Sequence, residues 1–409
     1  MNYQVTSPAM ARCHVQLPAS KSLSNRLLMI RAIAGCTTMP QGMGQCDDTS
    51  AMIAALGCDS TYINVGGAGT AMRFLTAYFA ALPGREVVLD GDERMRQRPI
   101  APLVDVLHNM GASIDYAGTP GFPPLRIAGR KLSGGIQSID GSVSSQFVSA
   151  LLMIAPVCGG LTLKVEGGAV SRPYIDMTLQ LMARCGVDAR WHGTTIVVPA
   201  RSYNPAQLSI EGDWSAAAFW FSMQALLPQS AIKLLGLERM SLQGDSAIVE
   251  LMKPLGVETC FGNDMVSLSH NGLPLPARYE RDMSATPDLV PALAVTLCLL
   301  RVPFTLTGLQ SLRVKESDRI EALRQELAKL GYSTEAEGSS LSYAGSYVET
   351  TQLVALDSHA DHRMAMALSL AATRHGTITI KAPQVVAKSY PQWWTHLTAA
   401  GFKIEKTEP

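Results

Sequence analysis

The sequence predicts a mixed α/β protein of two domains, each built from three copies of one repeat, a prediction that rests on three observations. Six stretches with helical periodicity end on a glycine that leads into a short apolar stretch, at Gly57, Gly111, Gly186, Gly256, Gly331 and Gly401. The intervals are 54 (111−57), 75 (186−111), 70 (256−186), 75 (331−256) and 70 (401−331) residues, so a large repeat recurs at nearly constant length. A chain of 409 residues, 47% of them hydrophobic, suits about two domains and hence three repeats in each.

The ends of the six helix-like stretches follow one rule. Residues 103–110 precede Gly111, residues 323–330 precede Gly331, and an apolar or aromatic residue follows each glycine. Glycine adopts the left-handed conformation that satisfies the last carbonyls of a helix, and the residue after it packs on the final turn. We therefore expect six left-handed glycines, most of them followed by a strand.

The helix beginnings carry basic residues where acidic ones are usual. Before four of the six helices the entry loop carries a basic residue within two positions of a Ser or Pro. These residues are Arg98, Arg172, Lys315 and Lys388. A cation at a helix start lowers stability unless an anion lies between it and the free backbone amides, and phosphate is the common case. For any one loop a solvated surface cation is the alternative, and four equivalent loops favour anion binding.

Composition excludes several classes of partner. Lys plus Arg equal Asp plus Glu at 34 each, so we expect no nucleic-acid partner. The start lacks the charged and apolar regions of a signal peptide, and the longest apolar runs, 147–158 and 289–300, are too short for a bilayer, so we expect a soluble protein without membrane contact. Eight cysteines without a CxxC pair suit reduced cytoplasmic thiols, with neither a metal site nor a disulfide.

The first candidate site lies at the start of the helix predicted after Ser20. Ser22 and Arg26 are four residues apart and share a helix face, with Lys21 beside them, which predicts an anion site. Serine N-capping is the alternative for Ser20 or Ser22. A glycine-rich loop that includes Gly69 follows a short strand-like run and would let a ligand approach the main chain, although it matches neither a P-loop nor a dinucleotide fingerprint.

Two further segments of the first half offer ligand groups. Of three neighbouring arginines, Arg98 is best placed to face a ligand, because it precedes a proline at a helix start. Ser144, Ser145 and Gln146 offer two hydroxyls and a carboxamide ahead of an apolar helix, which can orient a polyol or a phosphate. Ordinary helix capping is the alternative for at least one of the serines.

The second half carries the candidate acids. Asp288 precedes a strongly apolar helix and has N-capping as its alternative role. Lys315 and Arg319 are expected on one helical face with Glu316 adjacent, and an acid held among cations keeps its charge and can carry a proton. Surface salt bridges are the competing interpretation.

A cap, an imidazole and a guanidinium occur together in the last motif. Asp361, His362 and Arg363 stand at the mouth of an apolar helix. Because polar clusters seldom lie against such a run without a role, a functional interpretation is favoured here.

Taken together, these segments resemble the signatures of the EPSP synthase (5-enolpyruvylshikimate-3-phosphate synthase) family, in order along the whole chain. The matching segments are Leu17-Pro-Ala-Ser-Lys-Ser, Gly67-Ala-Gly-Thr-Ala-Met-Arg, Arg94-Met-Arg-Gln-Arg-Pro, Gly141-Ser-Val-Ser-Ser-Gln-Phe, Leu312-Arg-Val-Lys-Glu-Ser-Asp-Arg and Asp361-His-Arg-Met-Ala-Met. The resemblance implies an inside-out α/β barrel of β-α-β-α-β-β repeats, three per domain, with the active site in the cleft between domains. It implies an N-terminal domain of residues 20–213 and a second domain of residues 1–19 and 214–409, the latter seam agreeing with a cap predicted at Asp213.

The resemblance also implies a reaction. The family transfers the enolpyruvyl group of phosphoenolpyruvate to the 5-hydroxyl of shikimate 3-phosphate and releases phosphate, by addition and elimination through a tetrahedral intermediate, on the pathway to chorismate and the aromatic amino acids. No metal or organic cofactor is implied, and a cytoplasmic monomer is expected.

Site residues follow from the resemblance motif by motif. It implies Asp288 as the base for the 5-hydroxyl and Glu316 as the acid for the phosphoenolpyruvate methylene, with Lys21 sharing the second task. The shikimate 3-phosphate ligands implied are Lys21, Ser22, Arg26, Ser144, Ser145, Gln146, Ser171, Tyr174, Asp288 and Lys315. The phosphoenolpyruvate ligands implied are Lys21, Gly69, Arg98, Gln146, Arg319, His362, Arg363 and Lys388.

Four positions depart from the family pattern. Ala19 stands where Gly is usual, Gly67 where Asn is common, Phe74 where Pro often follows the Met-Arg pair, and Ser311 where Asn is frequent. We hypothesise altered inhibition by glyphosate, because Phe74 can shift the helix that carries Gly69. An inhibition constant equal to that of a Phe74→Pro variant would contradict the hypothesis.

Two other functions stay open at this point. The related UDP-N-acetylglucosamine enolpyruvyl transferase uses a mobile-loop cysteine as its acid, and residues 91–99 contain no cysteine here. A non-catalytic binding protein for phosphorylated metabolites needs the cations alone, so the presence of both Asp288 and Glu316 argues against it.

Overall fold

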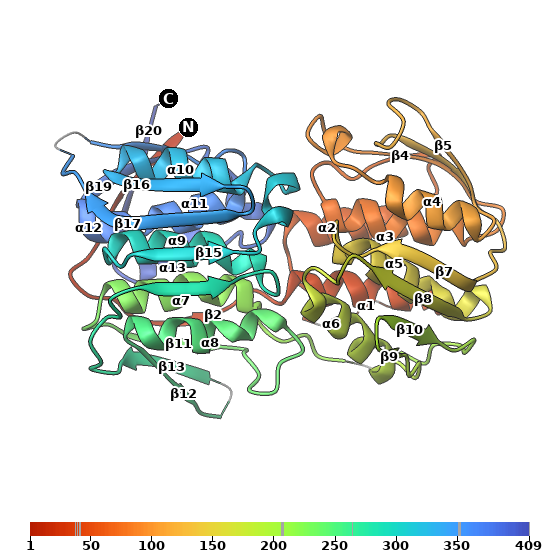
Figure 1. Cartoon of the computed structure of the whole chain (residues 1–409), viewed down its shortest axis with the longest axis horizontal. Coiled ribbons are helices and arrows are strands. Elements are labelled where there is room, and N and C mark those ends of the chain that lie inside the picture. The colour runs from red at the N-terminus through yellow and green to blue at the C-terminus, as the bar shows by residue number, and fades with distance from the viewer. Residues whose placement is uncertain are drawn as a thin grey trace. The chain divides into compact units, whose positions relative to one another are not determined.

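The computed structural model describes residues 1–36, 38, 40, 42–205, 208–263, 265–350 and 353–408. The chain forms two compact units. We call Met1–Ala19 with Glu211–Pro409 the split lobe, and Ser20–Ile210, which interrupts it in sequence, the inserted lobe. Figure 1 colours both by residue number.

The split lobe begins and ends with strands, and its helices lie between them in sequence. Its strands are β1 (Asn2–Thr6), β2 (Arg12–Gln16), β11 (Ala231–Leu235), β12 (Val257–Phe261), β13 (Met265–His270), β14 (Tyr279–Asp282), β15 (Phe304–Thr307), β16 (Tyr332–Glu337), β17 (Ser340–Tyr347), β18 (Ala355–Asp357), β19 (Thr377–Lys381) and β20 (Lys403–Thr407). Its helices are α7 (Trp214–Leu226), α8 (Ile248–Met252), α9 (Val290–Leu299), α10 (Arg319–Lys329), α11 (His362–Ser369), α12 (Ala372–His375) and α13 (Trp393–Ala399).

The inserted lobe begins with two helices and continues with alternating strands and helices. Its strands are β3 (Tyr62–Asn64), β4 (Glu86–Asp90), β5 (Ser113–Tyr116), β6 (Leu125–Ala128), β7 (Gly135–Asp140), β8 (Leu161–Glu166), β9 (Arg190–His192) and β10 (Thr195–Val198). Its helices are α1 (Lys21–Ile33), α2 (Asp47–Leu56), α3 (Gly69–Ala80), α4 (Ala101–Asn109), α5 (Ser145–Ile154) and α6 (Arg172–Arg184). The predicted α/β class is confirmed.

Five four-stranded sheets share one topology among the described residues. Their orders are β3-β4-β6-β5, β7-β8-β10-β9, β2-β11-β13-β12, β14-β15-β17-β16 and β18-β19-β1-β20. In every sheet the first two strands are parallel and the remaining neighbours antiparallel. The parallel pair needs a crossover helix, whereas a short hairpin joins the last two strands in four of the five sheets. In the fifth sheet β1 lies between β19 and β20, where each of the other sheets has the last strand of its own repeat. Strands from both ends of the sequence therefore belong to this sheet.

The first repeat of the inserted lobe departs from this pattern among the described residues. Helices α1 and α2 have no strand pair of their own among the described residues, and after Gly57 the chain enters β3, the first strand of the next sheet. Gly57 has a φ of −92°, whereas the other five repeat glycines have φ between 89° and 98°. The missing hairpin also explains why the first interval is 54 residues rather than 70 or more.

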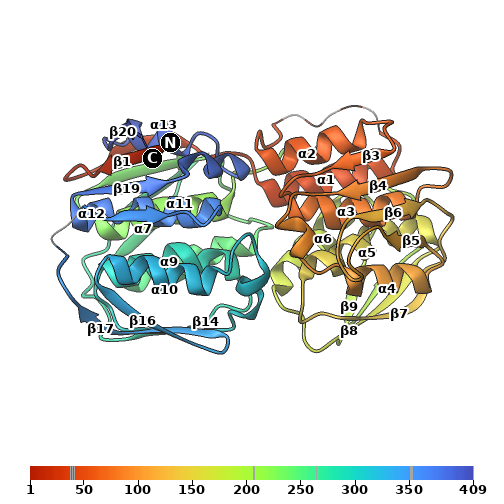
Figure 2. The same ribbon diagram turned by 90° about the horizontal axis from the view of Figure 1, so that it is seen from above.

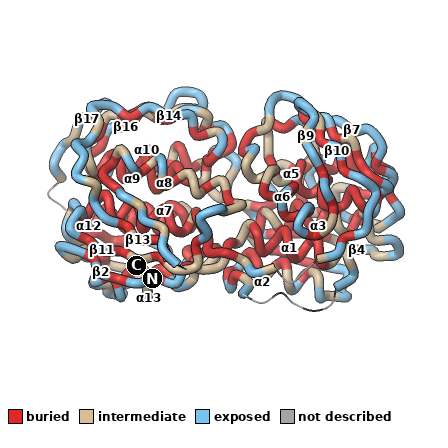
Figure 3. The backbone as a smooth tube through the Cα atoms, turned by 90° about the horizontal axis from the view of Figure 1, so that it is seen from below, coloured by how far each residue is buried: buried red, intermediate tan, exposed pale blue. Residues whose placement is uncertain are grey.

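Helices form the interior of the split lobe. All ten residues of α9 and all but one of the thirteen in α7 are buried, which fits helices that are apolar on every side. The strands instead alternate buried with exposed positions, so the sheets cover the helices (Figure 3). In Figure 2 the sheets that contain β1 and β16 lie on opposite sides of α7, α9 and α11.

Asp213 has the capping role that the sequence predicts, and it stands where the chain returns to the split lobe. The Asp213 carboxylate accepts a hydrogen bond from the Ala216 amide (3.0 Å) at the start of α7, as predicted. The Asp213 amide in turn donates to the Pro18 carbonyl (2.9 Å), which ties the two segments of the split lobe together. No described helix is both long enough and apolar enough to cross a membrane.

Candidate active site

A buried arginine gathers three carboxylates in the split lobe. The Nε atom of Arg319 lies 2.7 Å from Asp361, and its Nη1 atom lies 2.9 Å from Asp288. Its Nη2 atom lies 3.1 Å from Glu316. The planar guanidinium thereby holds both acids of the predicted mechanism in fixed positions, a task for which arginine is better suited than lysine. We call Asp288, Glu316 and Asp361 with Arg319 the carboxylate cluster.

Helix caps place two members of the carboxylate cluster. Asp318 caps α10, so the helix begins at Arg319, and Asp361 caps α11 through the Arg363 amide (2.9 Å). Lys315 precedes the helix with a ψ of −157°, so the prediction that Lys315 and Arg319 share a helical face is wrong. They meet instead at Asp288, where the Lys315 ammonium lies 3.5 Å from the carboxylate.

Further cations surround the carboxylate cluster. Arg363 Nη2 lies 3.1 Å from Asp288, and Lys388 Nζ lies 3.7 Å from Glu316. Burial raises the pKa of Asp288, but Arg363, Lys315 and Arg319 outweigh it and hold that pKa well below its ordinary value. Asp288 is therefore ionised across the ordinary pH range. Four cations thus surround the three carboxylates.

A fourth acid, which sequence reasoning did not select, lies near the carboxylate cluster. Asp245 is buried and accepts a hydrogen bond from the Ser215 hydroxyl. Burial and the charge of Asp288 raise its pKa to about 6, against which Arg363 acts.

A buried arginine of a different kind occupies the inserted lobe. Arg26 donates from Nε to the Thr178 hydroxyl (2.7 Å), and from Nη2 to the Ser149 hydroxyl (3.4 Å) and the Tyr174 carbonyl (3.2 Å). Its Nη1 donates to the Ser22 carbonyl four residues earlier (3.0 Å), as the predicted helix requires. Burial lowers the pKa of Arg26 to about 10. No carboxylate forms an ion pair with it among the described residues.

Arg98 faces the start of α3. A Cβ atom on Gly69 would lie 2.6 Å from Arg98 Nη1, so only glycine lets the guanidinium approach so closely. Arg98 is buried, and its Nε has no hydrogen-bond partner in the part of the chain that the structure describes. A buried cation beside the free amides of a helix start makes a site for an anion.

The other predicted ligands of the inserted lobe stand at helix starts. Lys21 begins α1 and pairs with Asp48 at 3.0 Å. The Gln146 carboxamide donates to the Thr70 hydroxyl (3.2 Å), which links α5 to α3. Ser144 caps α5 and Ser145 is its first residue, while Ser171 precedes α6 with a φ of 57°. In the split lobe the predicted ligand His362 is buried, with its Nδ1 3.7 Å from Asp361.

Sequence reasoning missed the hydroxyls that hold Arg26. Ser149 and Thr178 are fully buried within α5 and α6, and Thr178 also donates to Ser149 (2.9 Å). Lone hydroxyl residues in apolar helix faces were the available signal. One basic residue at a helix start proved to be a surface cation, because Arg172 lies over the Trp191 ring and 3.7 Å from Asp176.

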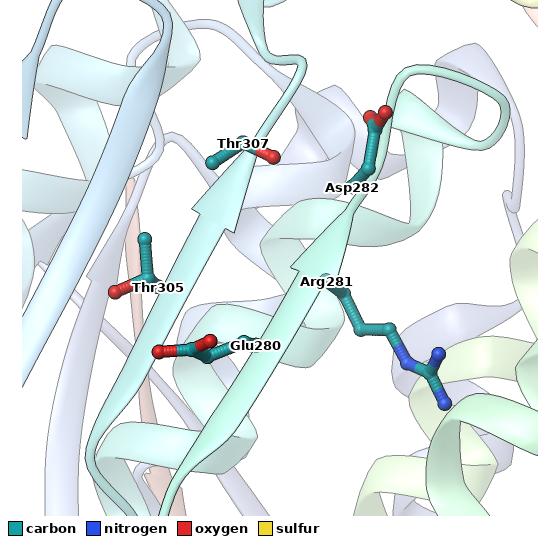
Figure 4. A pocket seen from close by; sticks show the side chains of 5 residues that line it. All are labelled: Glu280, Arg281, Asp282, Thr305 and Thr307. Carbon is teal, nitrogen blue, oxygen red and sulfur yellow. The ribbon is translucent and has the colours of Figure 1, made fainter.

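A separate hollow of about 330 Å³ lies on the β14–β15 pair. Glu280, Arg281, Asp282, Thr305 and Thr307 line it (Figure 4). None of these residues belongs to the predicted site, and four of the five are exposed, so the hollow is not assigned to it.

Comparisons with solved structures define the class. The fold matches EPSP synthase from Acinetobacter baumannii with a TM-score of 0.77 at 22% identity, covering 99% of this chain and all of that one. It also matches the enolpyruvyl transferase NikO from Streptomyces tendae with a TM-score of 0.74 at 16% identity, covering 100% of this chain and 99% of that one. The fold is thus that of enolpyruvyl transferases.

Sequence comparisons define the family. A family model described as EPSP synthase (3-phosphoshikimate 1-carboxyvinyltransferase) matches residues 58–397. A 3-phosphoshikimate 1-carboxyvinyltransferase of Bacteroides fragilis is 47% identical over the full length of both chains. One from Laribacter hongkongensis is 37% identical over 94% of this chain and 96% of its own. The chain belongs to the EPSP synthase family.

Proposed function

We propose that this protein transfers the enolpyruvyl group of phosphoenolpyruvate to the 5-hydroxyl of shikimate 3-phosphate and releases phosphate. Family membership supports the reaction. The single observation that carries the chemistry is the carboxylate cluster, where Arg319 holds Asp288 and Glu316 together within one lobe. The comparisons do not favour a UDP-N-acetylglucosamine enolpyruvyl transferase.

The two acids have opposite tasks in this proposal. Glu316 donates a proton to the methylene carbon of phosphoenolpyruvate, which creates cationic character at the carbon next to the enol oxygen. Asp288 accepts the proton of the 5-hydroxyl as that oxygen attacks the same carbon. As the tetrahedral adduct expels phosphate, Glu316 takes a proton back from the new methyl group, which re-forms the methylene, and the proton on Asp288 leaves with the phosphate. Because its depressed pKa makes Asp288 a weak base, its proton transfer must accompany formation of the carbon–oxygen bond, which acidifies the hydroxyl.

The Lys388 ammonium supports the assignment of Glu316. It lies 3.7 Å from one carboxylate oxygen while Arg319 lies 3.1 Å from the other. A neighbouring cation stabilises the Glu316 carboxylate after it has given up its proton, and it also stabilises the departing phosphate. Lys21, which the family resemblance also associates with this step, remains part of the proposal.

The two buried arginines of the inserted lobe supply anion sites. We assign Arg26 to the shikimate 3-phosphate, because its hydrogen-bond partners are neutral and leave its charge uncompensated. We assign Arg98 and the amides at Gly69 to phosphoenolpyruvate.

A paired assay tests the proposal. Purified protein is given both substrates and released phosphate is measured, together with shikimate 3-phosphate binding by calorimetry, for the wild type and for Asp288→Ala. We expect wild-type turnover, and in Asp288→Ala retained binding with turnover lowered by about 10²–10⁴-fold, the usual contribution of general base catalysis. A wild type that binds both substrates without releasing phosphate would instead support a binding protein.

Location and assembly complete the proposal. We propose a monomer of the cytoplasm, supported by eight cysteines of which none forms a disulfide and five are buried. Sedimentation at the enzyme's working concentration tests the monomer, and a concentration-dependent dimer would contradict it.

A further inference from the structure

The turn that leads into α11 holds an unusual backbone. His359 and Ala360 adopt φ of 50° and 53°, the left-handed region that residues other than glycine seldom occupy; Asn, Asp and His enter it more often than others, and Ala does not share that tendency. Such conformations persist only where surrounding contacts impose them. The next residue is Asp361, which caps α11 and holds Arg319 of the carboxylate cluster.

A buried carboxylate supplies those contacts. The Glu326 side chain is 1% exposed, and its Oε1 accepts a hydrogen bond from His359 Nε2 at 2.7 Å. Its Oε2 accepts from the Asp357 amide at 2.9 Å. The Asp357 carboxylate in turn accepts from the His359 amide at 2.7 Å. Glu326 thus fixes the turn at both its first residue and its strained residue.

The same helix holds the turn at a second point. Arg319 and Glu326 are seven residues apart in α10 (326−319), which places them on one face, two turns from each other. Arg319 binds Asp361 and Glu326 binds His359, so a rigid helix spans the strained pair. Relaxation of the backbone at residues 359–360 would shift Asp361 along α10 and turn the guanidinium that orients Asp288.

We propose that Glu326 and His359 are positioning residues for the carboxylate cluster: their hydrogen bond keeps the turn at residues 359–360 in its strained form, and so sets the place of Asp361 and Arg319. This inference rests on the proposed function, because it assigns these residues to the geometry of the same reaction. Neither residue touches a substrate in the proposal.

Lys329 provides a matched control. Its Nζ lies 2.7 Å from both oxygens of Glu326, as close as the His359 ring, but it belongs to α10 and makes no hydrogen bond or ion pair with the turn among the described residues. Lys329→Met therefore removes a partner of Glu326 without releasing the turn. If Glu326 had only a structural role, losing either partner would have similar consequences.

Two substitutions of His359 separate the hydrogen bond from the strain. His359→Asn tolerates the left-handed backbone but is too short to reach Glu326. His359→Gln restores a donor at nearly the distance of Nε2. We expect His359→Asn to lower kcat about tenfold to hundredfold, as a displacement of about 1 Å can do. We expect kcat near wild type in Lys329→Met and partial recovery in His359→Gln, with little change of KM in all three.

Hydrogen exchange gives a readout that needs no turnover. The amides of Arg363 and Ala365 bond to Asp361 at 2.9 and 3.0 Å, so they report on the start of α11. We expect their exchange to accelerate on the order of tenfold in His359→Asn and to stay unchanged in Lys329→Met. Equal exchange in the two variants, or wild-type kcat in His359→Asn, would overturn the inference. Absence of phosphate release by the wild type would overturn the proposed function, and the exchange comparison would still decide the positioning role.

Discussion

The most deeply buried arginine of each lobe, among the described residues, is Arg319 in one and Arg26 in the other, and the two have opposite surroundings. Arg319 in the split lobe is 1% exposed and lies within 3.1 Å of three carboxylates. Arg26 in the inserted lobe is 2% exposed, and its partners are two hydroxyls, two carbonyls and the Phe74 ring, whose centroid is 5.5 Å from the guanidinium carbon. The carboxylates outweigh burial and raise the pKa of Arg319, whereas burial lowers that of Arg26 to about 10.

This difference indicates that Arg319 has a structural role, whereas Arg26 is suited to bind an anion. A buried charge without a counter-charge is unfavourable until an opposite charge arrives, so Arg26 gains most from an anionic ligand. Arg319 is already compensated, and its removal would leave three carboxylates close together. Burial and residue type alone do not distinguish the two, because the identity of the partners decides.

The largest expected effect is on Arg319. Replacement Arg319→Gln keeps some hydrogen bonding but removes the charge that holds Asp288, Glu316 and Asp361 together. We expect the free energy of unfolding to fall by about 3–5 kcal/mol, the usual effect of breaking a buried ion pair from one side. Urea unfolding followed by tryptophan fluorescence measures it. A loss below about 1 kcal/mol would show that the carboxylate cluster does not depend on this guanidinium.

The next effect concerns Asp245 and has a defined pH dependence. Its folded-state pKa of about 6 exceeds the ordinary 3.8, so the folded protein binds the proton more tightly, and stability falls as pH rises between about 4 and 6. Replacement Asp245→Asn removes this penalty. We expect it to raise the free energy of unfolding by about 3 kcal/mol at pH 8 and by little at pH 4. An equal gain at both pH values, in parallel urea titrations, would contradict the assigned cause.

The prediction for Arg26 reverses that for Arg319. Replacement Arg26→Gln strands no carboxylate, so we expect the free energy of unfolding to change by less than about 1 kcal/mol. Shikimate 3-phosphate affinity should fall about tenfold to hundredfold, because a hydrogen bond to a charged group is worth about 1.5–3 kcal/mol. Calorimetric titration with shikimate 3-phosphate measures it. If Arg26→Gln unfolds as readily as Arg319→Gln, the two arginines do not differ as described.

The smallest effect separates the ring contact from ordinary packing. Phe74 and Phe79 are both buried in α3, but a guanidinium lies over Phe74 and none is recorded over Phe79 among the described residues. Leucine at either position leaves a similar void. We expect Phe74→Leu alone to weaken shikimate 3-phosphate binding, by about 1–2 kcal/mol, the worth of a desolvated cation–π contact. Equal affinity in the two variants would assign Phe74 to packing only.

Much of the fold could be predicted because glycine carries a local signal. Five repeat glycines have the left-handed conformation expected at a helix end; four of them precede the last two strands of a sheet, and Gly401 precedes β20. Gly57 was misjudged, because its surroundings in sequence look the same while its φ is −92°. The short interval that follows it was the sign that a hairpin is missing.

The candidate site was predictable where residues adjoin in sequence and not where helices pack. Lys315, Glu316 and Arg319 were found together, although Asp318 starts the helix too late for a shared face. The contact of Arg26 with Thr178 spans 152 residues and depends on how α1 packs against α6. No local pattern reports such a pair, so the neutral surroundings of Arg26 came from the structure alone.

The central proposal is that the carboxylate cluster, Arg26 and Arg98 serve one transfer reaction. Mass spectrometry of a quenched mixture of wild-type protein, phosphoenolpyruvate and shikimate 3-phosphate tests it most directly. We predict shikimate 3-phosphate that carries a new enolpyruvyl ether, formed in equal amount to the phosphate released. Pyruvate and phosphate formed beside unchanged shikimate 3-phosphate, or no reaction at all, would contradict the claim.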